Sequence, residues 1–447
     1  MNARATVQRR GACPGLSAPM PTGDGLLVRL IPIGTIALDA LAALCAAARS
    51  HGNGIIEVTG RGSIQIRGLT SASATRFAAA IAVLGIAAAD GIPVLTDPLA
   101  GIDALEILDA GALAADLRRA LSAASITKKL APKVSIAVDG GGALGLDELA
   151  ADVRLCAEAR DGDVVLRVGV GGDDASATHV GVVAPAHAVA AVMRLLEVIA
   201  NHGRDARARG ILAAEGVAPF RDALASYLAA RPASASDPQG KTKDGHGRDE
   251  RGGNDNGRRR DAIGTHVLRD GSLACGIGLG FGHANSETLE AMIEAARDAG
   301  ASGVRAAPGR VLIVIGLASA TAPSFVRAAE RLGFIVRADD PRRHVVACAG
   351  APACASAHVA ARVIAPSIAA AATTLVSQGL KVHVSGCVKG CAHPAPAALT
   401  IVGTAAGCAL IADGRADDSP ERIVPTSELS EAIAGAARAL AAETHHG

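Results

Sequence analysis

Four cysteines near the C-terminus are the residues of this 447-residue chain whose type and spacing most clearly suggest chemistry. Cys348 and Cys354 have five residues between them, Cys387 and Cys391 have three, and 32 residues separate the two pairs. A cubane 4Fe-4S cluster needs four thiolates, because each iron takes one soft anionic sulfur from the protein. Glycines in both loops allow the backbone to curl around a compact cofactor. The spacing predicts such a cluster.

Zinc and unrelated thiols are the alternatives to a cluster. Structural zinc loops usually space their cysteines two to four residues apart. Disulfides fit poorly with a chain that shows no secretory signal and has nine cysteines, an odd number. Of the other cysteines, Cys45, Cys156 and Cys408 sit in apolar runs and are predicted to be core, while the roles of Cys13 and Cys275 stay open.

An internal repeat divides the chain. Residues 68–86 and 316–334 align without a gap, with nine of 19 positions identical and an offset of 248 residues. A repeat this long exceeds the unit of a solenoid and indicates duplication of a whole pair of domains. At the same offset Asp139 falls opposite Cys387 and Ala143 opposite Cys391, so one half is expected to hold the cluster alone.

The C-x5-C and C-x3-C pairs together with the duplication resemble the siroheme nitrite and sulfite reductase family. The resemblance implies an α+β fold with a pseudo-twofold axis, in which each half is a ferredoxin-like half domain followed by a larger α/β domain. The first half fits it, because apolar patterns predict strand 26–33, helix 38–50, strands 55–58 and 63–67, and helix 73–84. Further strands are predicted at 135–138 and 164–170.

We therefore expect five segments. Residues 1–90 comprise an N-terminal segment and the first ferredoxin-like half domain, and 91–230 an α/β domain without cluster cysteines. Residues 231–262 are polar and rich in Gly and charge, which predicts a disordered linker rather than a nucleic-acid arm, because acidic residues are interspersed. Residues 263–338 form the second half domain and 339–447 the 4Fe-4S domain.

Composition limits the partners and the compartment. The formal net charge is +1, which offers no field for nucleic acid or a membrane surface. No uncharged apolar run is long enough to span a bilayer, and the basic N-terminus lacks the apolar segment of a signal peptide. A reducing cytoplasm is the expected setting. With no Trp, one Tyr and five Phe, the core must consist mainly of Ala, Val, Leu and Ile.

Several basic residues are candidates for binding an anionic ligand. Arg61 lies in the Gly-lined turn VTGRG, and Gln65 and Arg67 follow on the next strand. An arginine in such a turn suits bidentate binding of a carboxylate, although a solvated hairpin tip is an equal alternative from the residues alone. The stretch resembles the family's T-x-R-x-x-x-Q segment, which implies tetrapyrrole carboxylates as the ligand. Arg305 and Arg310 occupy the corresponding turn of the second half, and Lys133 lies in a basic stretch before a strand.

The chain departs from the reductases at one residue. Sulfite reductases carry two lysines one residue apart that hold the anionic substrate, whereas here Lys133 is followed by Ser135 at the second place. Losing that charge weakens the case for a small oxyanion. The segments 10–29, 58–68, 98–103, 131–142 and 383–394 instead resemble the precorrin-3B synthase family, the aerobic cobalamin branch.

That resemblance implies a monooxygenase that hydroxylates precorrin-3A at C20 with dioxygen and closes a γ-lactone. It also implies a mononuclear non-haem iron and reducing equivalents from NADH, delivered through a reductase or ferredoxin because no nucleotide-binding fingerprint is evident. Non-haem iron usually takes histidines and carboxylates, and His358, His383 and His393 lie near the cysteines. Histidines beside a cluster more often donate hydrogen bonds to sulfur than bind iron. No catalytic residue is assigned.

Two other interpretations remain open. One is a siroheme-dependent sulfite or nitrite reductase, which the missing second lysine disfavours. The other is a non-catalytic iron–sulfur or tetrapyrrole-binding protein. The electron donor, the oligomeric state and the pose of the substrate are not predictable from the residues.

Overall fold

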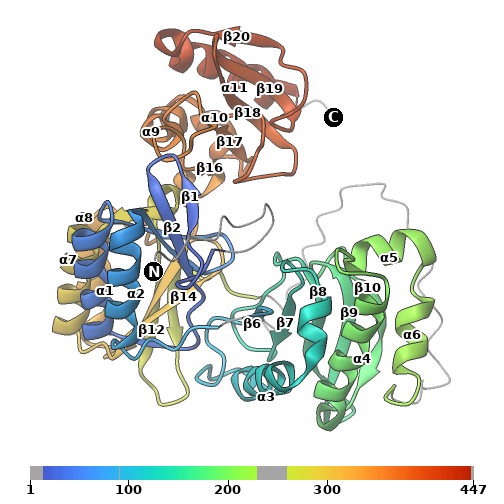
Figure 1. Cartoon of the computed structure of the whole chain (residues 1–447). Coiled ribbons are helices and arrows are strands. Elements are labelled where there is room, and N and C mark those ends of the chain that lie inside the picture. Colours follow the sequence, from blue (N-terminus) through green and yellow to red (C-terminus); the bar gives the residue numbers. More distant parts are fainter. Residues whose placement is uncertain (1–13, 90, 229–258, 444–447) are drawn as a thin grey trace, which may run out of the picture. The chain divides into compact units, whose positions relative to one another are not determined.

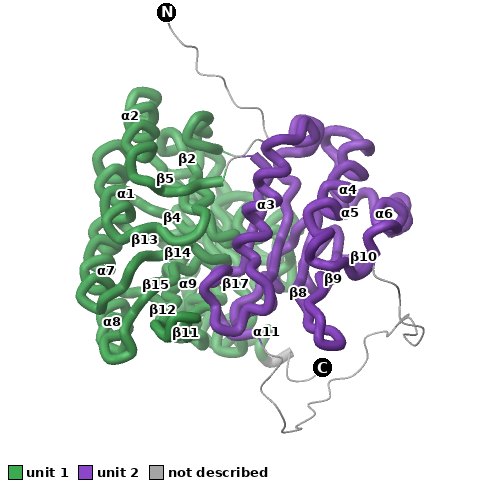
Figure 2. The backbone as a smooth tube through the Cα atoms, turned by 90° about the horizontal axis from the view of Figure 1, so that it is seen from below, with its two compact units in different colours: residues 1–90, 262–447 green, residues 91–261 purple. Residues whose placement is uncertain are grey.

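The computed structural model describes residues 14–89, 91–228 and 259–443. The chain forms two compact units, unit 1 from residues 1–90 with 262–447 and unit 2 from residues 91–261 (Figure 2). None of the helices in the described ranges has the length and apolar character needed to cross a membrane. Cys13 lies outside the described residues.

Unit 1 contains two five-stranded sheets with the same layout, one from each half of the repeat. The first has the order β1-β2-β5-β4-β13 and the second β11-β12-β15-β14-β3, with antiparallel pairs throughout. Each sheet thus takes its last strand from the other half. The bounds are β1 Met20–Thr22, β2 Gly25–Leu30, β3 Ile36–Ala37, β4 Ile55–Val58, β5 Ile64–Leu69, β11 Gly264–Val267, β12 Leu273–Gly278, β13 His283–Asn285, β14 Gly303–Ala307 and β15 Val311–Leu317.

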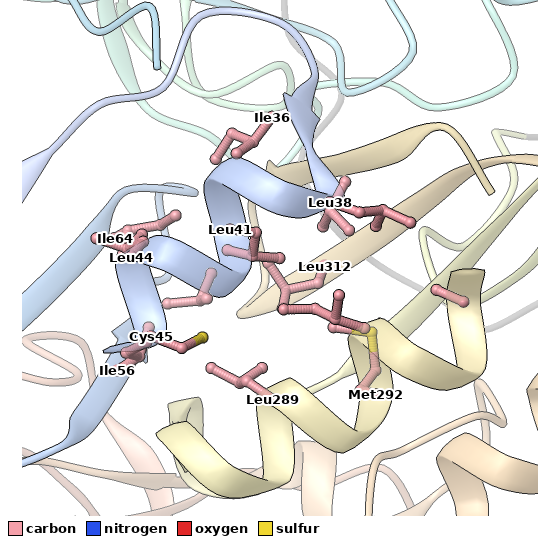
Figure 3. Close-up of a cluster of buried hydrophobic side chains, with 14 of the residues drawn as sticks. Ile36, Leu38, Leu41, Leu44, Cys45, Ile56, Ile64, Leu289, Met292 and Leu312 are labelled. Atoms are coloured by element: carbon pink, nitrogen blue, oxygen red, sulfur yellow. The ribbon is translucent and has the colours of Figure 1, made fainter. Parts of the chain in front are cut away.

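Four helices cover these two sheets and enclose one shared hydrophobic core. They are α1 Leu38–His51, α2 Ser71–Ala82, α7 Ser286–Asp298 and α8 Ala322–Arg331 (Figure 1). Side chains of α1, such as Leu41 and Leu44, meet Leu289 and Met292 of α7 over strands of both halves (Figure 3). Burial of this apolar surface joins the two ferredoxin-like halves into one body.

The predicted β-α-β-β-α order is confirmed. The helix predicted over 38–50 is α1, and the strands predicted at 55–58 and 63–67 are β4 and β5. The first strand ends at Leu30 instead of Ile33. The chain then leaves that sheet, and the short β3 pairs with β14 of the other half, a long-range pairing that apolar alternation cannot reveal.

The remainder of unit 1 is a sheet of order β16-β17-β18-β19-β20, packed against helices through its own core (Figure 1). β16 to β18 are parallel to one another, and the last two pairs are antiparallel. The bounds are β16 Val345–Ala347, β17 Val382–Ser385, β18 Ala397–Thr404, β19 Gly407–Gly414, β20 Arg422–Val424, α9 Ala361–Ala371, α10 Thr373–Val376 and α11 Leu429–Glu443.

Unit 2 repeats this domain. Its sheet runs β6-β7-β8-β9-β10, again with two parallel pairs followed by two antiparallel pairs, and the predicted strands at 135–138 and 164–170 are β7 and β9. The bounds are β6 Val94–Thr96, β7 Ile136–Asp139, β8 Ala151–Arg160, β9 Asp163–Gly172, β10 Thr178–Val183, α3 Ala110–Ala123, α4 Ala188–Asn201, α5 Ala208–Glu215 and α6 Ala218–Leu224. The duplication expected from the sequence is therefore present both in the ferredoxin-like half domains and in the larger α/β domains.

The linker expected over 231–262 lies largely outside the described residues, but its last four residues do not. Arg259 forms an ion pair with Asp139 at 2.9 Å. The amide of Arg260 donates to the carbonyl of Ala143 at 2.9 Å. Residues 259–261 belong to unit 2, and Ala262 begins the second part of unit 1.

Candidate functional site

The four candidate cluster cysteines lie on two loops at one edge of the β16–β20 sheet. Ala347 of β16 pairs with Val384 of the parallel strand β17. Cys348 follows β16 directly, and Cys387 comes two residues after β17 ends. Carboxyl ends of adjacent parallel strands meet at the same edge, where open α/β sheets bind their ligands.

The two loops are held against each other by backbone and side-chain contacts. The amide of Gly386 donates to Sγ of Cys348 at 3.1 Å, and Nζ of Lys389 donates to Oγ of Ser356 at 2.8 Å. A Cβ on Gly386 would lie 2.6 Å from Cβ of Ala357 and 3.4 Å from Sγ of Cys348. Only glycine permits this approach.

The four thiols are close enough to influence one another. Burial raises the pKa of Cys391, and the neighbouring Cys387, Cys348 and Cys354 raise it further. All eight cysteines in the described ranges are free thiols. Within those ranges no group of three or more His, Cys, Asp or Glu side chains converges to hold a single metal ion. The four thiols are thus close neighbours, and one thiolate for each iron is what a 4Fe-4S cluster requires.

The matching edge of unit 2 carries carboxylates and glycines in place of the cysteines. Thr96 of β6 pairs with Val138 of β7, just as Ala347 pairs with Val384. Counting from these pairs places Asp97 and Asp103 at the positions of Cys348 and Cys354, and Gly141 and Gly145 at those of Cys387 and Cys391. The constant offset had placed Asp139 and Ala143 there, which is wrong by two residues because the loops before the strands differ in length.

Shared hydrogen bonds support this register. The amide of Gly140 donates to Oδ2 of Asp97 at 3.2 Å, as Gly386 does to Cys348. Asp103 donates its amide to Leu99 at 3.0 Å, and Cys354 does so to Gly350 at 2.8 Å. The two edges therefore share one backbone design and differ in the side chains that they present.

An arginine fills the unit 2 edge. Arg259 pairs with the buried Asp139, and its Nη1 donates to the carbonyl of Gly142 at 3.2 Å. A Cβ at Gly145, the position of Cys391, would lie 2.9 Å from Cζ of Arg259. Asp97 is 1% exposed, and its Oδ1 has no hydrogen-bond partner among the described residues. Burial and Asp139 raise its pKa to about 8. In unit 2 the guanidinium of Arg259 therefore compensates the buried carboxylate of Asp139. The equivalent edge of the β16–β20 sheet presents thiols.

The two turns with candidate arginines pack against each other in unit 1. Arg61 forms an isolated antiparallel bridge with Pro308, and the amide of Gly309 donates to Gly60 at 3.0 Å. Arg310 follows in the second turn with φ at 66°, so its backbone takes a conformation that side chains rarely adopt. The structure therefore packs the turn of Arg61 against the turn that precedes Arg310, at equivalent places in the repeat.

Arg310 stands out by its surroundings. Burial lowers the pKa of its half-buried guanidinium, and the charge of Arg362 lowers it further. Its Cδ lies against Gly282, where a Cβ would come within 2.7 Å. Among the described residues it has no acidic partner. An uncompensated cation in this position favours an anionic ligand.

The other predicted substrate residues are placed differently. Gln65 is buried in β5 and, with its amide oxygen turned to Arg29, accepts from Nε and Nη2 at 2.9 and 2.7 Å. Arg67 is buried among acidic partners. Nε of Arg305 donates to Oγ1 of Thr35 at 2.8 Å. Lys133 is exposed in unit 2, ahead of β7.

Two of the three candidate histidines lie together. His383 on β17 is 0% exposed, and within the described ranges neither ring nitrogen has a hydrogen-bond partner. Its ring centroid is 5.7 Å from that of His393. Burial lowers the pKa of His383 to about 4, with smaller effects of His393 and Arg310. Nε2 of His393 lies 3.2 Å from the carbonyl of Pro396. His358 instead lines a surface pocket of about 250 Å³ beside Cys387, together with Val388 and Lys389.

Sequence reasoning missed three charged residues near the first cysteine loop. Asp24, Glu57 and Arg362 are largely buried and form ion pairs that connect β4 and β5 to the turn between β1 and β2 and to α9. His283, whose pKa is lowered by burial and then by Arg362, lies beside them. The pairing of Glu57 with Gln65 across β4 and β5 could have pointed to Glu57, because it places an acid beside Gln65 and near Arg67, two residues that the sequence already suggests.

Comparisons with known proteins agree with this architecture. The profile of the nitrite/sulfite reductase ferredoxin-like half domain matches residues 18–84. A precorrin-3B synthase from Sinorhizobium is 37% identical over 427 residues, covering 95% of this chain and 88% of the relative. A ferredoxin–nitrite reductase from Synechococcus elongatus is 24% identical over 411 residues, covering 86% and 77%. The solved structure of the NirA protein of Mycobacterium tuberculosis has a TM-score of 0.71 at 19% identity, covering 92% and 79% of the two chains, which concerns the fold alone.

Proposed function

The chain belongs to the precorrin-3B synthase family, and from this premise we propose that it is an oxidoreductase of cobalamin biosynthesis that converts precorrin-3A to precorrin-3B. The proposed reaction is a monooxygenation at C20 with formation of a γ-lactone. One atom of dioxygen enters the tetrapyrrole, and the other leaves as water after two electrons and two protons are supplied.

We propose that Cys348, Cys354, Cys387 and Cys391 bind a 4Fe-4S cluster. When bound, such a cluster passes single electrons from a reduced donor. The protein contributes the shape of the site, since Gly386 lets the two loops approach and its amide donates to Sγ of Cys348. Amide donors to thiolate sulfur stabilise the more negative, reduced state of a cluster.

The geometric observation that carries the substrate assignment is the half-buried, uncompensated guanidinium of Arg310 beside the turn of Arg61. Precorrin-3A has many carboxylates, and a charge-assisted hydrogen bond from a fixed arginine is the interaction that holds such a group. Arg61 and Arg310 are proposed to bind and orient the macrocycle. Arg305 and Lys133, on the surface of their respective units, remain candidates for further carboxylates.

A mononuclear non-haem iron is also proposed, and His383 and His393 are its candidate ligands. His383 and His393 offer two imidazoles, and the unpartnered ring nitrogens of His383 are available donors. The described residues do not assemble a three-ligand site for one ion around them. No step of the reaction is therefore assigned to these residues, and His358 lies in the pocket beside Cys387.

Electrons are proposed to come from NADH through a separate reductase or a ferredoxin. Cys391 is exposed, and the pocket beside Cys387 is bordered by Val388, which is 59% exposed, and Lys389. This face is therefore proposed as the docking site of the donor. A cytoplasmic setting, where thiols stay reduced, is proposed with it.

A siroheme-dependent nitrite or sulfite reductase is the weaker candidate. Its resemblance in sequence is 24%, against 37% for the precorrin-3B synthase. Ser135, which replaces the second substrate lysine, is 3% exposed, and its amide donates to Asp152 at 3.1 Å. A small buried serine therefore stands where the resemblance expects the second substrate-binding lysine.

The test is to measure the incorporation of labelled oxygen from ¹⁸O₂ into the product. Purified protein with a reduced donor, precorrin-3A and ¹⁸O₂ is expected to yield a product that contains one labelled oxygen. Its absorption spectrum is expected to show the broad shoulder of a cluster without the Soret and Q bands of siroheme. An unlabelled product, or reduction of sulfite or nitrite by siroheme-containing protein, would contradict the proposal.

A further inference from the structure

Arg67 is predicted from the sequence to bind substrate, but the structure places its guanidinium inside the protein. Its side chain is 7% exposed, and Nη2 lies 3.2 Å from Oδ1 of Asp24. Nε lies 3.6 Å from Oε1 of Glu57. A substrate carboxylate would have to displace these acids from a buried site, which would take from Asp24 the arginine that it pairs with. The charge of Arg67 is therefore already neutralised by two acids within the protein.

The remaining contact of Arg67 reaches the first cysteine loop. Nη2 donates a hydrogen bond to the carbonyl of Ala353, the residue directly before Cys354. The amide of Gly23, in the turn between β1 and β2, donates to the same carbonyl at 3.1 Å. A Cβ on Gly23 would lie 2.5 Å from the carbonyl oxygen of Pro352. This turn is therefore packed tightly on the loop, and two donors fix one peptide group of it.

A second ion pair connects the same strands to the helix that follows the loop. Nη1 of Arg362, in the first turn of α9, lies 2.6 Å from Oε1 of Glu57, and both side chains are at most 15% exposed. Asp24, Arg67, Glu57 and Arg362 thus form a chain of alternating charge with no net charge. Buried ion pairs of this kind contribute little net stability but specify one relative position of the elements that they join.

We propose that Arg67 is a positioning residue for the thiolate of Cys354 rather than a ligand of the tetrapyrrole. By holding the carbonyl of Ala353, it sets the path of the loop that brings Cys354 toward the other three cysteines. The position of a thiolate and the hydrogen bonds around it tune both the retention and the potential of a cluster. The inference rests on the proposed 4Fe-4S cluster and concerns how β5 supports it.

The test compares Arg67→Met with wild type in full-length protein reconstituted anaerobically with iron and sulfide. Removing the guanidinium is expected to accelerate loss of iron to a chelator by about 10-fold, the scale seen for groups that support metal ligands. The midpoint potential and the electron paramagnetic resonance signal of the reduced cluster are expected to shift as well. Arg67→Lys should recover part of each effect, because an ammonium can reach the carbonyl or the carboxylate of Asp24 but lacks the planar fork.

Arg29→Met is the matched control. Arg29 lies on β2 of the same sheet and is bound by Gln65. Its loss removes a guanidinium from the same sheet while leaving the contacts to Ala353 in place. Iron release, potential and resonance signal of this variant should equal those of wild type, and equal shifts in Arg29→Met and Arg67→Met would overturn the inference.

Further outcomes separate this inference from the cluster assignment. Wild-type iron release, potential and spectrum in both Arg67 variants would overturn the positioning role. If Arg67→Met does not fold, the same three measurements on Arg67→Lys decide. Cys354→Ala distinguishes the cluster assignment from the positioning role of Arg67. If this variant keeps full iron and sulfide, the cluster assignment itself has failed. If it loses them while the Arg67 variants match wild type, only the positioning role is wrong.

Discussion

The amide of Gly140 donates a hydrogen bond to Oδ2 of Asp97 at 3.2 Å. The equivalent amide in the other half, that of Gly386, donates to Sγ of Cys348 at 3.1 Å. Duplication has therefore kept a backbone that presents an N–H to the side chain at this position, which is a carboxyl group in unit 2 and a thiol in the other half. In unit 2 the neighbouring carboxylate of Asp139 is paired within the chain, by Arg259.

Asp97→Asn should change the pH dependence of stability. Burial and then Asp139 raise the pKa of Asp97 from 3.8 to about 8, so between these values the folded state binds a proton that the unfolded state has released. The free energy of unfolding should therefore fall as pH rises through this window, by at most about 1.4 kcal/mol per pH unit. Asparagine keeps an acceptor for Gly140 and removes this dependence. Denaturant titrations between about pH 5 and 8 measure the slopes.

Asp161→Asn provides the control, because Asp161 is exposed in the turn between β8 and β9 of the same sheet. It should keep the wild-type slope. An identical slope in Asp97→Asn and wild type would show that Asp97 is ionised in the folded protein and that Arg259 compensates both carboxylates.

The elements were predictable from sequence to the extent that their signals are local. Apolar periodicity and turn residues identified α1, β4, β5 and β9, and cysteine spacing identified the loops of the candidate cluster. The exchange of β3 and β13 between halves was not predictable, since two or three residues carry no periodicity and pair at a distance. Arg67 was assigned to substrate because a sequence shows the arginine but not the acids, Asp24 and Glu57, that the fold brings to it.

The cysteine assignment predicts a clear division among the thiols. Alanine at Cys348, Cys354, Cys387 or Cys391 should abolish stoichiometric iron and sulfide, because each iron loses its protein ligand. Cys45→Ala should keep both, since Cys45 is 0% exposed in the core of the ferredoxin-like halves and burial raises its pKa to about 12. Iron and sulfide analysis after anaerobic reconstitution measures this. Full content in any of the first four variants would refute the assignment.

Two deletions of the linker should differ in stability. Removing residues 235–257 should leave iron content and turnover near wild type, because closure entropy depends only weakly on the length of the connection. Extending the deletion through Arg259 also removes the partner of the buried Asp139, and breaking a buried ion pair costs about 3–5 kcal/mol. Thermal unfolding followed by circular dichroism compares the two. Equal melting temperatures would mean that Arg259 does not compensate the unit 2 carboxylates, and an inactive shorter deletion would mean that the linker is functional.

Arg310→Met should move binding and stability in opposite directions. Its guanidinium is half-buried without an acidic partner among the described residues, so removing the charge should stabilise the substrate-free protein by about 1 kcal/mol. The same change removes a charge-assisted hydrogen bond and should weaken binding of precorrin-3A by roughly 1.5–3 kcal/mol. Arg61→Ala should weaken binding similarly without the gain in stability, because Arg61 is exposed. In both variants the cluster spectrum should be unchanged.

The measurement is an anaerobic titration of cluster-loaded protein with precorrin-3A, paired with thermal unfolding of the substrate-free protein. Arg331→Ala, an exposed arginine at the end of α8, should leave both quantities unchanged. A dissociation constant that does not change in Arg310→Met would remove this residue from the substrate site. A loss of stability in the same variant would show that the guanidinium is compensated within the protein. Arg310 would then not be an unpaired cation suited to an anionic ligand.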